Sequence, residues 1–276
     1  MAEVVGRADA IPGTGAGGPR RAARPGADEV LAELGGSTGG WRRLATPVML
    51  GAVCVALYVY VQGQDLDRIE VVSLNAPMIR QRLIEHLHLT LVSTAIVIAI
   101  AVPLGVLLTR PGARRLTPFV LGLANIGQAV PSIGILVLLA VTVGIGFEEA
   151  IYALVLYAVL PILRNTMVGL RQVDLALIEA ARGMGLSSRQ VLTRVELPLA
   201  VPVMLAGIRT ALVINVGSAA LGTFVGAGGL GWIINQGNIH NRTPVLLTGS
   251  VLTAVVALAL DWLAGLVEDV LRPKGL

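Results

Sequence analysis

Six apolar runs, each near or above the length that crosses a bilayer, constrain this chain more than any other feature. A helix of about 20 apolar residues spans the hydrocarbon core, and in lipid only helices and closed barrels pair every backbone polar group. With 55% hydrophobic and 14% charged residues, soluble globular folds are excluded. The sequence predicts an all-α, polytopic membrane protein with about six transmembrane helices, at roughly 45–62, 88–109, 117–142, 149–169, 199–224 and 244–267.

Basic residues lie mainly on one side of these runs. Of the 21 lysines and arginines, 16 fall on the flanks that share a side with both termini, and four fall on the opposite flanks. Because positively charged loops remain in the cytoplasm, both termini are predicted to be cytoplasmic, in the plasma (inner) membrane of a prokaryote. Topology accounts for the basic excess, so the partner that it indicates is the lipid membrane and not nucleic acid.

The same pattern divides the chain into three regions. Residues 1–43 are rich in Gly, Pro, Ala and Arg, which predicts a disordered cytoplasmic tail. Residues 44–271 form the predicted transmembrane domain, and 272–276 form a short cytoplasmic tail.

Two features modify the spans. Between the first two runs, Met78, Ile79, Leu83 and Ile84 recur at helical spacing, which predicts a short surface helix on the external side, leading into the second span. In the third run, Pro131 frees a backbone carbonyl, which predicts a kink that faces protein or a water-filled path and not lipid.

The longest strongly polar passage between apolar runs covers residues 172–198. Asp174 is suited to cap a helix that the glycines around Gly185 end. Ser187-x-x-Gln190 has the spacing of a capping box and predicts a second short helix, which Pro198 ends. The passage is predicted to form a compact cytoplasmic knob of two helices joined at a glycine elbow.

This passage resembles the signature loop of the permease subunits of ATP-binding cassette (ABC) importers. The resemblance lies in Glu179-Ala180-Ala181, Gly185 after three further residues, and Val195-x-Leu197-Pro198 after nine more, with Val195 where the family usually has isoleucine. It implies a type I importer permease fold, in which residues 172–198 are the coupling loop that sits in a groove of a cytoplasmic ATPase dimer. The residues implied to couple to the ATPase are Glu179, Ala180, Ala181, Gly185, Val195, Leu197 and Pro198. An ordinary amphipathic loop helix is the alternative.

Three further strings are similar to the osmoprotectant branch of these permeases. They are Tyr157-Ala-Val-Leu-Pro161-Ile-Leu-Arg164-Asn165-Thr166, Gly207-Ile-Arg209-Thr210 and Gly226-Ala-Gly228-Gly229-Leu-Gly231. The resemblance implies import of glycine betaine, choline, carnitine or related quaternary ammonium compounds. It covers residues 75–270 approximately, and a permease for another small solute, such as methionine, remains the alternative.

The chain contains no phosphate-binding loop with which it could hydrolyse ATP. Its only lysine, Lys274, follows Pro273 and fits no phosphate-binding loop. ATP and Mg are therefore expected on a separate ATPase subunit, and the chain is expected to be a transport subunit, not an enzyme. The resemblance also implies a second permease subunit, the same or homologous, and an extracellular substrate-binding protein.

The string Gly226-x-Gly228-x-x-Gly231 matches a dinucleotide fingerprint by letter only, because an apolar span precedes it where a strand should stand. We interpret these glycines as a tight turn with close helix packing near the external mouth, with shaping of a gate as the alternative.

Charged and polar residues inside the spans are the remaining candidates. Arg209 and Asp261 lie about equally far from the cytoplasmic ends of their spans, which suggests an interhelical structural ion pair. Each other polar side chain either lines a translocation path or makes a helix-to-helix hydrogen bond. These path candidates are Asn125, Gln128, Ser132, Asn165, Thr166, Asn215 and Ser218.

Two functions of other classes remain open at this stage. An ion-driven secondary transporter would need inverted repeats and midplane carboxylates, and no carboxylate lies near mid-span. A scaffold subunit without transport is the other. His86 and His88 are two residues apart and point in different directions on a helix, so no metal site is expected.

Overall fold

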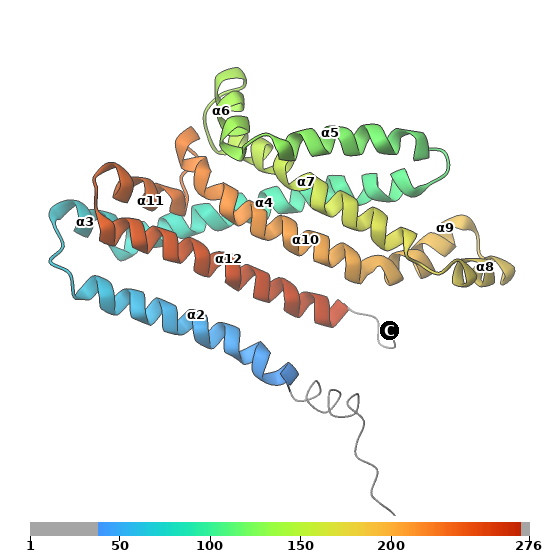
Figure 1. Ribbon diagram of the computed structural model, residues 1–276, viewed down its shortest axis with the longest axis horizontal. Coiled ribbons are helices and arrows are strands. Elements are labelled where there is room, and N and C mark those ends of the chain that lie inside the picture. Colours follow the sequence, from blue (N-terminus) through green and yellow to red (C-terminus); the bar gives the residue numbers. More distant parts are fainter. Residues whose placement is uncertain (1–37, 272–276) are drawn as a thin grey trace, which may run out of the picture. The chain divides into compact units, whose positions relative to one another are not determined.

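The computed structural model describes residues 38–271, with side chains from Leu44 onward, and every regular element in this range is a helix (Figure 1). Most of the predicted N-terminal tail and the predicted tail at 272–276 lie outside the described residues. Residues 38–43, assigned to that tail, instead form the start of the first long helix.

Five long helices are apolar enough to cross a membrane, and a bent pair of shorter helices makes a sixth candidate span. The long helices are α2 (Thr38–Gln62), α4 (Ala76–Thr109), α7 (Phe147–Arg171), α10 (Leu197–Ala219) and α12 (Thr243–Leu271). The bent pair is α5 (Thr117–Ala129) and α6 (Ser132–Thr142). The remaining elements are α3 (Arg68–Ser73), η1 (Arg114–Leu116), α8 (Leu175–Gly183), α9 (Ser188–Val191), the π-helical turn η2 (Leu192–Glu196), η3 (Ala220–Val225) and α11 (Leu230–Ile239).

The predicted external surface helix is wrong as a separate element. Asn75 caps α4 by accepting from the Met78 N–H at 2.8 Å, and from there the helix runs without a break through the whole second span. Between Pro77 in the first turn and the start of the predicted span at His88, no proline or glycine interrupts the helix, and the later Pro103 is carried within it. The predicted second span is therefore the C-terminal part of α4, a helix of 34 residues.

The third apolar run breaks more sharply than a proline kink. α5 and α6 meet at 95° across Val130 and Pro131. Pro131 has no N–H to donate, and its ring disfavours helical backbone at Val130, whose ψ is 132°. The run is therefore two helices bent at Pro131, the form of a broken span or of a re-entrant loop.

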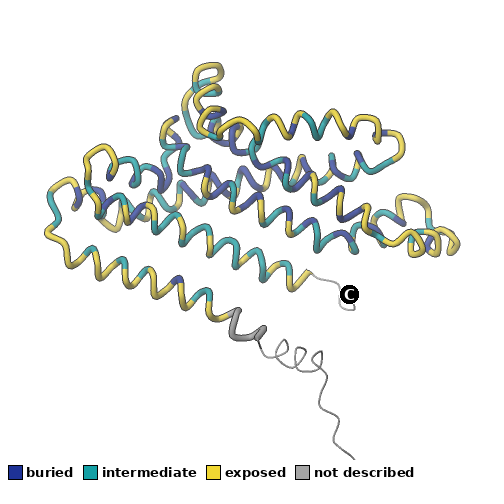
Figure 2. Tube along the Cα trace, viewed as in Figure 1, coloured by how far each residue is buried: buried dark blue, intermediate teal, exposed yellow. Residues whose placement is uncertain are grey.

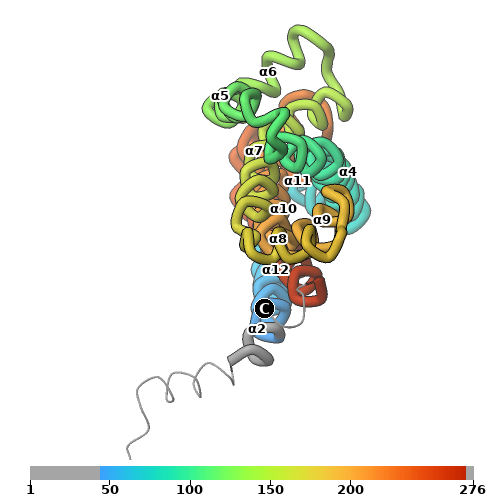
Figure 3. The backbone as a smooth tube through the Cα atoms, turned by 90° about the vertical axis from the view of Figure 1, so that its right-hand side faces the viewer, coloured from blue at the N-terminus to red at the C-terminus, as the bar shows by residue number. Residues whose placement is uncertain are grey.

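α7 is the centre of the fold. It packs against α4, α5, α6 and α10, and its buried side chains include Leu154, Ala158, Leu160, Ile162 and Leu163 (Figures 2 and 3). α12 packs on α10 and α11 and remains largely half-buried. α8 and α9 lie at one end of this bundle, and α3 and α11 lie at the other (Figure 1).

Candidate functional site

The 172–198 segment forms a helical knob at one end of the bundle. Asp174 caps α8 by accepting from the Ala176 N–H at 2.9 Å, and Ser187 and Gln190 form the capping box of α9, as predicted. Gly185 has φ +84°, a left-handed conformation that lets the Leu186 N–H reach the Ala181 carbonyl at 3.2 Å. Glycine adopts this conformation without strain, so the elbow depends on it.

The knob presents one buried and one open side. Ala181 is 2% exposed, while Glu179, Ala180 and Gly185 are exposed. Large apolar side chains also face outward here, with Leu175 63% and Met184 75% exposed. Exposed apolar side chains gathered at a protruding helical elbow are typical of a docking surface for another protein.

Pro198 does not end the second helix, contrary to the sequence-based prediction. α9 continues through the π-helical turn η2 into α10, with Pro198 in the first turn of that helix. The Leu197 N–H donates to the Leu192 carbonyl, five residues back, in place of an α-helical bond. Because Pro198 lacks an N–H and its ring would clash with the carbonyl four residues earlier, the wider turn accommodates it without a break. Val195 and Leu197 are half-buried on either side of Glu196.

Of the seven path candidates, three make hydrogen bonds between helices. The Asn215 amide, fully buried in α10, donates to the hydroxyls of Ser93 at 3.1 Å and Thr94 at 3.0 Å in α4. Gln128 donates to the Tyr157 carbonyl at 3.2 Å, and Asn125 accepts from Arg164 at 2.6 Å.

The other four candidates are buried or half-buried. A Cβ on Gly207 of α10 would come 2.5 Å from the Asn165 Cβ, and one on Gly105 of α4 would come 2.8 Å from Thr166. Asn165 and Thr166 therefore mark close helix crossings on α7. Ser218 is buried in α10, and Ser132 is half-buried at the start of α6. A groove of about 410 Å³ between α4, α5, α6 and α7 is lined by apolar side chains such as Leu104 and Leu156, and none of the seven lines it.

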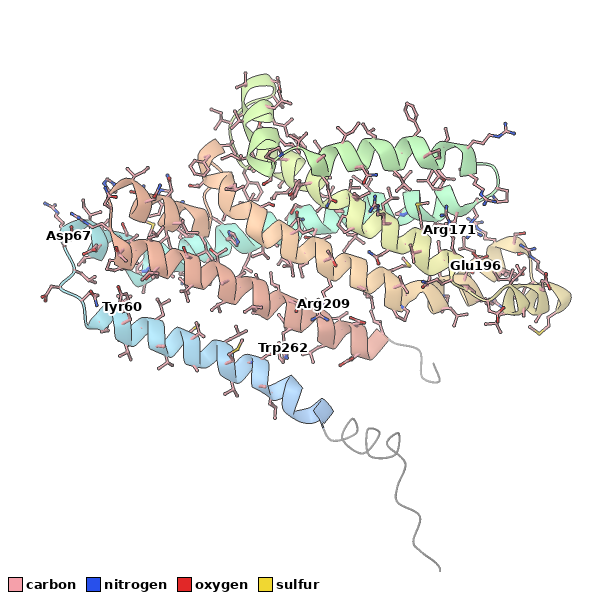
Figure 4. All side chains as sticks on the ribbon, viewed as in Figure 1. Tyr60, Asp67, Arg171, Glu196, Arg209 and Trp262 are labelled. Atoms are coloured by element: carbon pink, nitrogen blue, oxygen red, sulfur yellow. The ribbon has the colours of Figure 1, made fainter. Side chains whose placement is uncertain are left out.

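Arg209 on α10, which is labelled in Figure 4, forms an ion pair with Asp261 on α12 through two guanidinium nitrogens, with the Nη2–Oδ2 distance 2.6 Å. Glu268, two turns further along α12, lies 3.8 Å from Arg209 Nη1. The pair satisfies a charge that would be costly alone in an apolar span.

The structure adds polar contacts at both ends of the bundle that the sequence did not single out. At the α8–α9 end, Arg110 and Glu196 form a bidentate ion pair, 3.2 and 2.5 Å long. The signal was present: a carboxylate directly before a span needs a partner, but nothing in the sequence says which arginine.

At the α3–α11 end, Glu85 accepts from Arg82 at 2.8 Å and from the Gly229 N–H at 3.0 Å. The Arg82 guanidinium stacks 4.4 Å from the Trp232 ring. Gly229 has φ +80°, a left-handed conformation, so the glycines at 226–231 form a turn. The hydrogen bond to the Glu85 carboxylate holds this turn against α4.

A second ion pair at that end joins Arg242 to Asp67 at 2.7 Å. The Glu70 backbone N–H, helped by the Arg242 charge and the Ile69 N–H, holds the pKa of Asp67 below its ordinary value of 3.8, and the smaller effect of burial opposes this.

Comparison with known proteins agrees with the architecture. Residues 101–273 match the family of binding-protein-dependent transport system inner membrane components. The carnitine transport permease protein OpuCD of Listeria monocytogenes is 49% identical over 175 residues, which are 63% of this chain and 78% of that one. The glycine betaine/carnitine/choline transport system permease protein OpuCD of Bacillus subtilis is 40% identical over 73% of this chain and 87% of that one.

A solved structure, of inward-facing conformations of the MetNI methionine ABC transporter, matches with a TM-score of 0.63 and 30% identity, over 72% of this chain and all of that one. It shares the all-helical type I importer fold. The chain is thus a multi-pass membrane protein and a transport subunit, in which ATP hydrolysis is left to a separate polypeptide. It belongs to the family of binding-protein-dependent transport system inner membrane components, the permease subunits of ABC importers.

Proposed function

We propose that this permease imports quaternary ammonium osmoprotectants, of the glycine betaine, choline and carnitine type. The observation that carries the proposal is the 40–49% identity to permeases named for carnitine, or for glycine betaine, carnitine and choline together. The solute would arrive on an extracellular binding protein, and two permease subunits, the same or homologous, would form the path.

The 172–198 segment is the proposed coupling loop, docked in a cytoplasmic ATPase dimer that holds ATP and Mg. Its exposed Glu179 and Ala180, and the outward-facing Leu175 and Met184, support this role. The arginines concentrate at this end, which supports an orientation with both termini in the cytoplasm of a prokaryotic cell. ATP binding would draw the two coupling loops together and rock the attached helices between inward-facing and outward-facing states.

Among the polar candidates, we assign the path to Asn125, Gln128 and Ser132, which lie exposed or half-buried beside the break between α5 and α6. Irregular backbone at membrane depth is tolerated where it is covered by protein or lines a water-filled cavity. The remaining four, Asn165, Thr166, Asn215 and Ser218, hold α4, α7 and α10 together in this proposal.

The test is uptake into proteoliposomes that contain the permease, its ATPase and its binding protein. We expect ATP-dependent accumulation of labelled glycine betaine, choline or carnitine, which excess unlabelled quaternary ammonium solute abolishes and methionine does not. Preference for methionine would overturn the solute assignment. Uptake by the permease alone, driven by an ion gradient, would overturn the transport mechanism.

The coupling assignment is tested by Gly185→Val, which forces a β-branched residue into left-handed backbone at an exposed site with open space around it. ATP hydrolysis should become uncoupled from uptake while solute capture by the binding protein stays intact. The matched control is Gly183→Val, two residues earlier, where φ is ordinary and the space is equally open. Equal effects of the two changes would count against a special role for the elbow.

A further inference from the structure

The ion pair between Arg110 and Glu196 joins two parts of the chain that are 86 residues apart. Arg110 is the residue at which α4 ends, and Glu196 closes the π-helical turn η2 of the 172–198 segment. The Glu196 side chain is 7% exposed, and that of Arg110 is 35% exposed. Both carboxylate oxygens of Glu196 are used, so the contact fixes orientation as well as distance.

The π-helical turn is what turns Glu196 inward. Val191, Glu196 and Ala200 are all buried, at 1%, 5% and 0% exposure. In an α-helix, the side chains of residues five apart, such as Val191 and Glu196, point about 140° away from each other. A π-helical turn holds about one residue more than an α-helical turn, so it brings these two side chains onto the same face. The wide turn forced by Pro198 therefore sets a carboxylate among buried residues, where it needs a cation.

α4 is the helix for which this contact matters. α7 leads directly into the 172–198 segment and α10 leads directly out of it, so the chain itself connects both to the knob. α4 has no such connection. At this end it meets the segment through the ion pair. Val102 and Val106 also belong to an apolar cluster that includes Leu192 and Leu197 of the segment. Apolar surfaces can slide past one another, whereas a bidentate ion pair resists sliding.

A second polar contact joins α4 to α10 farther along the same two helices. Asn215 holds Ser93 and Thr94 in the middle of the bundle, so the helices are tied at two levels. The Asn215 contact lies at mid-bundle, whereas the ion pair lies at the end next to the knob, so it is the ion pair that ties the end of α4 to the knob.

We infer that the Arg110–Glu196 pair is the link through which the 172–198 segment moves α4 during the transport cycle. The inference rests on the proposed coupling role of that segment. Both residues are positioning residues: they touch neither solute nor ATP, and they make the motion of the knob reach a helix that the chain does not attach to it.

The first test compares coupling in reconstituted complexes carrying Glu196→Gln, Arg110→Gln and the charge exchange Arg110→Glu with Glu196→Arg. The single changes should keep ATP hydrolysis within about twofold of the unchanged complex and lower solute imported per ATP about tenfold. The charge exchange should recover at least half of that ratio. Arg115→Gln, an exposed arginine at the same end, is the matched control and should change neither quantity.

Unchanged import per ATP in both single variants would overturn the inference. So would equal losses of hydrolysis, uptake and thermal stability that the charge exchange does not recover, because the pair would then act only in folding. The unchanged complex separates the two proposals: if it hydrolyses ATP without importing any quaternary ammonium solute, the proposed function fails on its own.

The second test needs no solute. Spin labels are placed at Gly112 and Gly183, where an added side chain meets open space, in a chain whose single cysteine is removed by Cys54→Ala. With the ATPase bound, the 112–183 distance should stay constant between ATP-free and ATP-bound states, because the end of α4 follows the knob. In Glu196→Gln the distance should change by several ångströms between the states; a distance that is insensitive to Glu196→Gln would overturn the link.

Discussion

The close approach of α11 to η3 at Gly231 leads to a sharp prediction about stability. A Cβ built on Gly231 would lie 2.6 Å from the Ala220 carbonyl carbon and 2.9 Å from its Cα, and closer still to its carbonyl oxygen. Ordinary contacts begin at 3.4 Å, and the carbonyl oxygen is the nearest atom, so α11 would have to withdraw by about 1.5 Å or more. All three atoms are backbone, so no side chain can rotate to relieve the overlap.

The expected cost follows from what the withdrawal disturbs. Leu230 and Ile233 of α11 are fully buried and pack with Val245, so moving the helix loosens this cluster. Overpacking of this kind costs about 1–3 kcal/mol or more, against a gain of up to about 1 kcal/mol from replacing a helical glycine with alanine. We therefore expect Gly231→Ala to lower the free energy of unfolding by about 2 kcal/mol.

The matched control is Gly217→Ala in α10, where the added Cβ meets nothing within 4 Å. It should leave stability unchanged or raise it by up to about 1 kcal/mol, so the two alanine variants should differ by about 3 kcal/mol. The measurement is equilibrium unfolding in mixed micelles, supported by a difference in Tm on the order of 6–12 °C. If the two variants fall within about 1 kcal/mol of each other, the glycine string does not serve close packing, and the argument from backbone contact is refuted.

Three further outcomes are expected. A double-mutant cycle of Arg209→Leu and Asp261→Leu should give a coupling energy of about 1–2 kcal/mol, and independent behaviour would show that the ion pair adds nothing to the α10–α12 contact. Asn215→Val should cost about 1–2 kcal/mol in the same unfolding assay because it leaves two buried hydroxyls of α4 without their donor, and a cost near zero would contradict that account. Because the pKa of Asp67 is lowered in the folded state, the stabilisation that this carboxylate gives is complete above its ordinary pKa of 3.8 and is lost as pH falls below that value. The protection factors of the α3 amides, which are exchange rates corrected for the intrinsic pH dependence of amide exchange, should accordingly fall on acidification in the unchanged chain but not in Asp67→Asn. A fall shared by both would assign the effect to other groups.

Local signals in the sequence predicted local structure well. Asp174 and the Ser187–Gln190 pair are placed as caps by rules that involve only three or four neighbouring residues, and both caps are present. Pro131 correctly marked an interruption, although its extent was underestimated, because a 95° turn depends on how α5 and α6 pack onto α7. Pro198 was interpreted as a helix end. The π-helical turn that absorbs it could not be foreseen, because it turns Glu196 inward, and a buried carboxylate is tolerated there only because an arginine 86 residues away pairs with it.

For the polar residues inside the spans, too, some roles could be predicted from the sequence and others could not. Arg209 and Asp261 could be matched because antiparallel neighbouring helices bring equal depths together. The alternative roles of Asn125, Gln128 and Asn215 could not be separated from sequence, because a path residue and an interhelical donor look alike until the helix rotation is known.

The sequence by itself determined that this chain spans a membrane with about six helices, roughly where those spans lie, and where the caps of α8 and α9 and the elbow at Gly185 fall. Hydropathy and the need to hydrogen-bond every backbone polar group in lipid act on each segment separately. Predictions based on them are therefore valid in whatever way the helices are arranged. Only the tertiary structure decided that Glu196 finds Arg110, that Asn215 reaches Ser93, and that α11 lies against η3 at Gly231. Each of these contacts depends on which helices are neighbours and on how each helix is rotated about its axis. That arrangement is set by the packing of small residues between helices, which the hydropathy of the sequence does not reveal.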